Sequence, residues 1–233
     1  FAAPIARRII EAYYGLRYAR YPWEASVGVP ADSVATPTPD PNAHAACPMA
    51  VTTHLLYLHG FRSSPLSFKA VRIDAWLRAH RPEVRFWCPQ LPPSPQQALR
   101  LVIDGTAGWP ADRSAVIGSS LGGFYATVVA ERLGWRAVLL NPAIDPARDL
   151  GPFVGTLPHY HRPDTHFEFT AADVEQLRQL MPAAITRPER YAAVIAKGDE
   201  VLDWREMTGR YPGARVKLLE GSDHALSDFD DHL

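Results

Sequence analysis

The residues with the clearest chemical potential form a G-x-S-x-G pattern at 118–122. This pattern joins a short apolar run at 115–118 to a stretch at 121–133 that we expect to be helical. A serine at such a strand-to-helix turn has a strained backbone, and the flanking glycines let neighbouring chain segments approach closely. We therefore predict that Ser120 is a nucleophile at the end of a strand, beside the backbone N–H of Leu121. The alternative is a glycine-rich turn without a catalytic role.

A serine hydroxyl needs a general base before it can act as a nucleophile. In sheet enzymes that carry this motif, the acid and then the histidine follow the serine along the chain. His224 stands in the sequence GSDH, directly after an apolar run at 216–219, and is predicted to be the base. His232 is the alternative histidine near the end of the chain, and we expect it to be a surface residue of a terminal helix.

The acidic partner of the histidine is expected after the apolar run at 191–196. Asp199 is the first acidic residue beyond that run, and its predicted role is to fix the imidazole tautomer and stabilise the imidazolium. Two alternatives stay open. Asp203 is one of them, although it could instead cap a helix at 204–209, and Glu200 is the other.

A tetrahedral oxyanion needs two hydrogen-bond donors. The backbone N–H of Leu121 is predicted to be one of them. The second is expected from the loop 59–64, which follows the first apolar run, and the N–H of Phe61 is the candidate. His59 begins this loop, and we expect it to order the loop rather than to act as a base.

The elements that must position these residues alternate along the chain between apolar runs and amphipathic stretches. Predicted strands cover 54–58, 84–88, 115–118, 137–140, 191–196 and 216–219, and predicted helices cover 65–80, 95–105, 121–133 and 171–181. Such alternation favours an α/β fold with a mostly parallel six-stranded sheet and helices on both faces. A proline-rich segment at about 143–190 interrupts the rhythm and is predicted to be a small lid insertion.

The proline distribution also divides the chain near Met49. Residues 30–48 are rich in proline and have almost no large apolar side chains, so they indicate an extended tail. The residues before them suit a short amphipathic helix. We therefore expect an N-terminal extension at 1–48, which could lie outside the native domain, and a working domain at 49–233.

Composition excludes several classes of function. The 233 residues carry a net charge of −1, which gives no field for holding nucleic acid or an acidic membrane surface. The chain has 2 cysteines and no metal-binding cysteine spacing, and His159, His161 and His166 lack the spacing of a zinc site. The sequence has no apolar run of membrane-spanning length and no secretory signal. We expect a cytoplasmic protein without a metal or cofactor.

Several segments together resemble the YqiA/YcfP-type esterases. They read LLYLHGF-SSP-S-KA in 55–70, IGSSLGGFYAT in 117–127, LLNPAI-P in 139–146, KGDEVLD in 197–203 and EGSDHALSDF in 220–229. The resemblance extends over the chain after Met49. It implies an α/β-hydrolase fold with a minimal sheet that lacks the early hairpin, and acyl-ester hydrolysis by Ser120, His224 and an acid within 199–203.

The sequence thus predicts a serine esterase that acts on a small-molecule acyl ester. One alternative is an acyl-CoA thioesterase with the same triad, in which lid arginines such as Arg148 or Arg162 would face the phosphates. Another is a hydrolase-like binding module without catalysis. The presence of a serine, an acid and a histidine in the expected order argues against that module.

Overall fold

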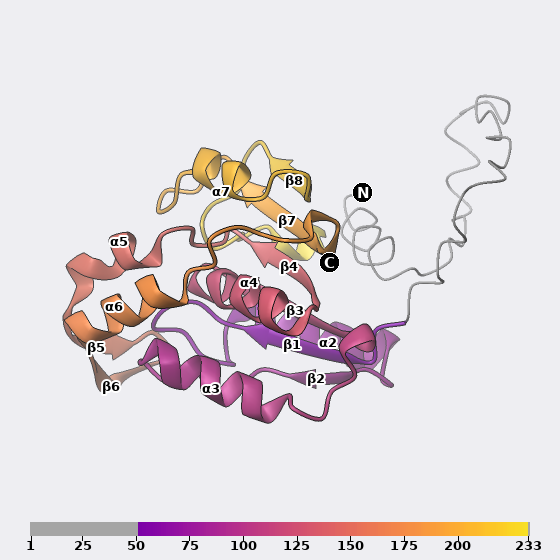
Figure 1. Cartoon of the computed structure of the whole chain (residues 1–233), viewed down its shortest axis with the longest axis horizontal. Helices are drawn as coiled ribbons and strands as arrows, with labels where there is room; N and C mark the ends of the chain where they lie inside the picture. The colour runs from indigo at the N-terminus through magenta and orange to yellow at the C-terminus, as the bar shows by residue number, and fades with distance from the viewer. Residues whose placement is uncertain (1–50, 233) are drawn as a thin grey trace, which may run out of the picture.

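A computed structural model describes residues 51–232, and the expectations for residues 1–48 lie outside this range. Its central feature is a six-stranded sheet with the order β2-β1-β3-β4-β7-β8, in which every neighbouring pair is parallel (Figure 1). The strands are β1 (His54–Leu58), β2 (Arg85–Trp87), β3 (Ser114–Ser119), β4 (Arg136–Leu140), β7 (Tyr191–Ala196) and β8 (Arg215–Leu219). The six predicted strands are therefore confirmed, with ends that differ by one residue or less.

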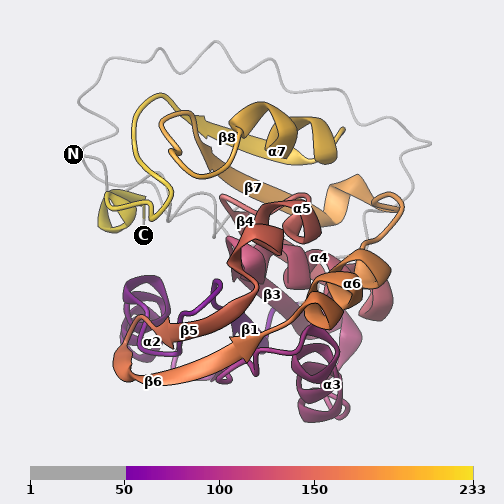
Figure 2. The same cartoon turned by 90° about the vertical axis from the view of Figure 1, so that its left-hand side faces the viewer.

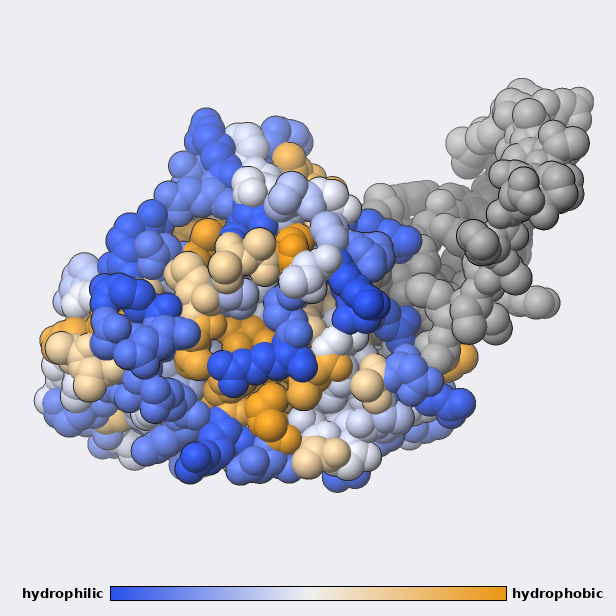
Figure 3. Space-filling model, in the orientation of Figure 1, coloured by the Kyte–Doolittle hydropathy of each residue, from blue (hydrophilic) through white to orange (hydrophobic). Residues whose placement is uncertain are grey.

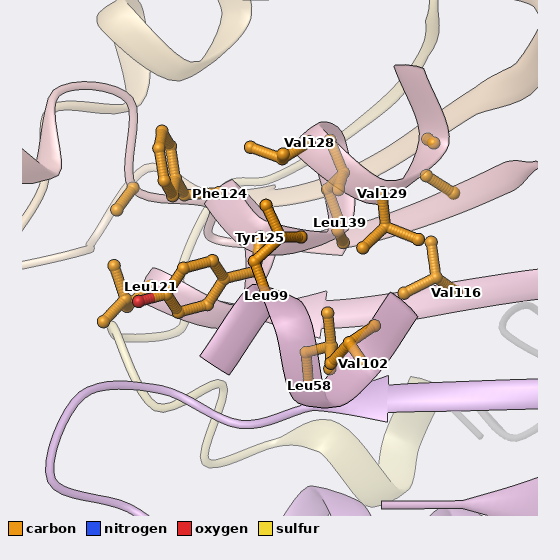
Figure 4. Packing of buried hydrophobic residues seen from close by; sticks show 14 of the residues in the cluster. Leu58, Leu99, Val102, Val116, Leu121, Phe124, Tyr125, Val128, Val129 and Leu139 are labelled. Carbon is orange, nitrogen blue, oxygen red and sulfur yellow. The ribbon is translucent and has the colours of Figure 1, made fainter. Parts of the chain in front are cut away.

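Two apolar layers bury the faces of this sheet, because successive side chains of each strand point to opposite sides. One layer joins the sheet to helices α3, α4 and α7, and the other joins it to α2 and to the C-terminal turn η5. These elements are α2 (Phe68–His80), α3 (Pro95–Gly105), α4 (Leu121–Leu133), α7 (Trp204–Arg210) and η5 (Phe229–His232). Figure 4 shows part of the first layer, in which Val128 and Val129 of α4 belong to the same apolar cluster as Leu139 and Val116 of the sheet. The predicted arrangement of helices on both faces is thus confirmed.

The segment between β4 and β7 forms a cap at the carboxyl edge of the sheet, on the side that faces the viewer in Figure 2. The cap consists of α5 (Pro146–Leu150), the turn η3 (Gly151–Phe153), the antiparallel hairpin β5 (Gly155–His159) and β6 (Arg162–Phe169), and α6 (Ala171–Leu180). The sequence predicted the lid and its helix but not the hairpin. The cap therefore covers the edge where the loops with the candidate catalytic residues emerge.

Two predicted helices differ from the observed elements. The helix expected at 65–80 begins at Phe68, because residues 65–67 form a turn with Ser67 at the N-cap. The terminal helix expected around His232 is a short 3₁₀ turn in the described residues.

Figure 3 shows apolar side chains gathered toward the middle of one face, surrounded by hydrophilic ones. Within residues 51–232, no helix combines the length and apolar character that crossing a membrane requires.

Candidate active site

Ser120 stands at the sharp turn between β3 and α4. Its backbone has φ 55° and ψ −122°, a left-handed conformation that costs about 1–3 kcal/mol for a residue with a Cβ. The turn is held by neighbouring backbone. Ser120 N–H donates to Leu140 O at 3.0 Å, and Ser120 O accepts from Gly123 N at 2.8 Å and from Ala143 N at 3.0 Å. The hydrogen bonds to the end of β4 and the residues after it hold the backbone of the predicted nucleophile in place.

The glycines of the motif are required by close packing. A Cβ on Gly122 would lie 1.9 Å from Leu58 O, and a Cβ on Gly118 would lie 2.1 Å from Gly122 O. Neither distance is compatible with a side chain, so the start of α4 can approach β1 and β3 only with glycine at both positions. This packing places the Ser120 hydroxyl at the carboxyl edge of the sheet.

The structure brings the predicted nucleophile, base and acid together. Ser120 Oγ lies 3.0 Å from His224 Nε2, and His224 Nδ1 lies 2.8 Å from Asp199 Oδ2. With a carboxylate acceptor beside it, Nδ1 carries the imidazole proton, and Nε2 can accept the serine proton. The Asp199 side chain is fully buried, whereas that of His224 is 20% exposed, so the base can reach a substrate.

The two alternative acids occupy different positions. The carboxylate of Asp203 caps α7 by accepting the Arg205 N–H at 2.8 Å. Glu200 accepts the backbone N–H of His224 at 3.0 Å. Asp199 alone of these three contacts the imidazole ring among the described residues, and its second oxygen accepts the N–H of Val201 and Leu202.

The loop after β1 passes directly beside the nucleophile. A Cβ on Gly60 would lie only 3.3 Å from Ser120 Cβ, so the loop brings the backbone of Phe61 to the site. His59 is buried, pairs through Nδ1 with Gly60 O at 3.0 Å, and accepts the Leu91 N–H on Nε2 at 3.1 Å. Burial lowers the pKa of His59 to about 4, which keeps the ring neutral. His59 therefore orders the loop, as predicted.

Asn141 is a residue whose role the sequence analysis missed. It is fully buried at the end of β4, and its Oδ1 accepts the Ala196 N–H at 2.8 Å. Its Nδ2 donates to Asp223 O at 3.0 Å and His224 O at 3.2 Å. One amide thus connects β4, β7 and the loop that carries the histidine. The available signal was a polar residue directly after a buried apolar strand.

Ser120 and His224 line a cleft with a volume of about 570 Å³ beneath the cap. Apolar residues make up much of its wall: Phe61, Ala143, Pro146, Leu150, Phe153, Val201 and Leu202. The Phe61 ring packs edge-on against Phe153, Phe167 and Phe169, which belong to the cap. The wall therefore suits a small apolar group beside the nucleophile.

Several cap residues that were considered as ligands for phosphate or a metal make contacts within the protein instead. Arg148 donates to both carboxylate oxygens of Glu206, at 2.9 and 2.7 Å, and to Asp149 at 2.8 Å. His161 pairs with Ser64 Oγ at 2.9 Å, and His159 packs against Phe167. The part of the chain that the structure describes contains no group of at least three metal-ligating side chains.

The family model and the relatives that match this chain belong to the same protein family. The model of the Uncharacterised protein family (UPF0227) matches residues 54–233. The UPF0227 protein of Yersinia enterocolitica is 26% identical over 184 residues, which cover 77% of this chain and 94% of the relative. A UPF0227 protein of Yersinia pestis has the same identity and coverage. The family resemblance predicted from the sequence motifs is thereby confirmed.

Solved structures with a similar fold include α/β-hydrolases. Mouse alpha/beta hydrolase domain-containing protein 10 superposes with a TM-score of 0.60 at 15% identity, covering 78% of this chain and 86% of its own. The esterase domain of a Rhodothermus marinus protein gives a TM-score of 0.56 at 20% identity, with 77% and 81% coverage. Est1E from Butyrivibrio proteoclasticus gives 0.54 at 15% identity, with 76% and 81% coverage. The predicted α/β-hydrolase fold is confirmed.

Proposed function

We propose that this chain, which belongs to the UPF0227 family, is a serine hydrolase that cleaves small-molecule carboxylic esters with Ser120, His224 and Asp199. The observation that carries the proposal is the hydrogen-bonded series from Ser120 Oγ to His224 Nε2, at 3.0 Å, and from His224 Nδ1 to Asp199 Oδ2, at 2.8 Å. Esterases among the proteins of similar fold add support.

In the proposed mechanism, Ser120 Oγ attacks the ester carbonyl carbon while His224 Nε2 takes the hydroxyl proton. The N–H groups of Leu121 and Phe61 stabilise the oxyanion of the tetrahedral intermediate. The intermediate collapses with cleavage of the ester C–O bond, and His224 gives its proton to the departing alcohol. Water then attacks the acyl-enzyme with the same proton transfers, which releases the acid and restores Ser120. Asp199 stabilises the imidazolium that forms in each half-reaction.

Acyl-CoA thioester hydrolysis receives less support. Arg148, one of the two arginines considered for the phosphates, is held by Glu206 and Asp149, so its guanidinium is already neutralised. Catalysis is also favoured over a binding module, because the site keeps the acid, the base and the nucleophile in contact. Ester hydrolysis is therefore the function that we propose.

Covalent labelling tests this proposal. A fluorophosphonate should modify the full chain at one serine, and peptide mass spectrometry should locate the adduct on Ser120. Ser120→Ala should abolish labelling and lower the hydrolysis of 4-nitrophenyl butyrate by several orders of magnitude, because it removes the nucleophile. Ser119→Ala is the matched control, since Ser119 is the adjacent serine of the motif, and it should keep most of the activity.

Two results would contradict the proposal. One is a chain that neither reacts with the fluorophosphonate nor hydrolyses any ester of a series from acetate to laurate. The other is a label on Ser119, with activity lost in Ser119→Ala instead of Ser120→Ala. A parallel series of acyl-CoA substrates would show whether thioesters react faster than the oxygen esters.

A further inference from the structure

The cleft contains an amine that the proposed hydrolysis does not use. Lys69 extends from the first turn of α2, lines the cleft with Ser120, and donates a hydrogen bond to Ala225 O. Ala225 directly follows His224, so this ammonium lies next to the proposed base. Burial lowers the pKa of Lys69 to about 8, and the group is therefore still largely protonated at neutral pH.

The charge of Lys69 has no close counterion among residues 51–232. No carboxylate oxygen of this range lies within 4.0 Å of its Nζ. Asp223 is the carboxylate that acts on Lys69 electrostatically. The Asp223 carboxylate already accepts hydrogen bonds from the backbone N–H of Ser227, at 2.9 Å, and from the Ser227 hydroxyl, at 2.6 Å. A partly buried cation without a close counterion is stabilised when an anion binds beside it.

Other polar groups of the cleft suit the same ligand. Ser67 lines it at the N-cap of α2, and its buried hydroxyl lies beside the Tyr57 hydroxyl, with which it interacts. Arg62 adds a second cation, which donates to Pro158 O at 2.9 Å and lies over the Tyr160 ring. The cleft is also lined by the acid Asp149, whose Oδ1 accepts from Arg148 at 2.8 Å and whose buried Oδ2 has no hydrogen-bond partner among the described residues.

We propose that Lys69 forms an anion-binding subsite, so that the favoured esters carry a carboxylate or another negatively charged group. This inference rests on the ester hydrolysis proposed above and adds the substrate class. An ammonium has three N–H donors, and the hydrogen bond to Ala225 uses one of them. The remaining donors are available for an anionic oxygen of a substrate that is bound at Ser120.

Two matched pairs of esters test the subsite on the full chain. 4-Nitrophenyl hemisuccinate and 4-nitrophenyl butyrate have acyl groups of equal length, and only the first is charged. 3-Acetoxybenzoate and 3-acetoxybenzamide carry the same contrast on the leaving group. In at least one pair, the wild-type kcat/KM should favour the charged ester. Lys69→Met should lower that preference by about tenfold to a hundredfold, which corresponds to a charge-assisted hydrogen bond.

A matched control separates the subsite from a general effect of charge. Arg72 stands on the same helix with a half-exposed side chain that pairs with Asp230, and it does not line the cleft. Arg72→Met should therefore leave the ratio of charged to neutral ester unchanged. Lys69→Gln provides a second variant if Lys69→Met does not fold, and fluorophosphonate labelling reports independently whether the site is intact.

The outcomes distinguish this inference from the proposed function. If the wild type is labelled and hydrolyses the neutral esters, but favours the charged ester in neither pair, the anion subsite is wrong and ester hydrolysis stands. An equal loss for charged and neutral esters in Lys69→Met also overturns the subsite, because Lys69 would then only support the loop of His224. Absence of labelling and of all hydrolysis refutes the proposed function itself.

Discussion

Replacing Asp199 with asparagine should reverse the tautomer of the proposed base. The N–H groups of Val201 and Leu202 donate to Asp199 Oδ1 at 2.8 and 2.7 Å, so an asparagine must keep its carbonyl oxygen on that side. Its NH₂ group then faces His224 Nδ1, which can only accept a hydrogen bond from it. The imidazole proton moves to Nε2, where it blocks acceptance of the Ser120 proton.

The size of the effect follows from these contacts. Turning the amide over would break two hydrogen bonds and set its NH₂ against two N–H groups, at a cost of about 2–6 kcal/mol. The active tautomer is therefore rare in Asp199→Asn. We expect kcat to fall by about 10⁴, as in serine hydrolases whose aspartate is replaced by its amide. This loss corresponds to about 5 kcal/mol of transition-state stabilisation.

Steady-state hydrolysis of 4-nitrophenyl butyrate measures this loss. Asp203→Asn is the matched control, because it makes the same change of charge four positions away and asparagine caps helices as well as aspartate does. It should keep kcat within about twofold, and thermal melts should show both variants folded. A large drop in Asp203→Asn, or an Asp199→Asn variant with more than about a tenth of the wild-type kcat, would refute the tautomer argument.

Two further predictions concern residues that hold the site. Asn141→Ala should lower the free energy of unfolding by about 2–4 kcal/mol, because it leaves the Ala196 N–H and two carbonyls without their partner, and it should lower kcat more than it raises KM. Denaturant melts measure the loss of stability and steady-state kinetics measure kcat and KM; a normal kcat would contradict a positioning role. The His59 pKa of about 4 lies below its unfolded value near 6.5, so the unfolded chain binds more protons between these values. The free energy of unfolding should consequently fall by up to about 3 kcal/mol as pH drops from 6.5 to 4, and denaturant melts of His59→Gln should show a smaller fall. An identical pH dependence in that variant would show that His59 is not its source.

Elements buried on both faces were predictable from the sequence. β7 is a continuous apolar run and β3 contains the apolar run 115–117, and glycine and proline signals that end a strand lie in or near both. The motif around Ser120 and the order of Asp199 and His224 indicated the site, because parallel strands place their carboxyl ends at one edge of the sheet.

The remainder depends on contacts that local patterns do not encode. In β6, only Phe167 and Phe169 are not exposed, and β5 contains Pro158, so neither strand shows the apolar alternation of a buried strand. The hairpin exists because these aromatic rings pack on Phe61, which is distant in the chain. The role of Asn141 has the same origin, since its partners in β7 and in the loop of His224 follow much later in the sequence.

The hairpin of the cap is also tied to the loop after β1. Arg62 donates to Pro158 O at 2.9 Å, and Tyr160 N–H donates to Arg62 O at 2.9 Å. The cap is consequently not an independent module that evolution or an engineer could exchange at will. A cap transplanted from a relative would have to bring matching partners for the loop beside Ser120, so new substrate ranges should arise through paired changes in both segments.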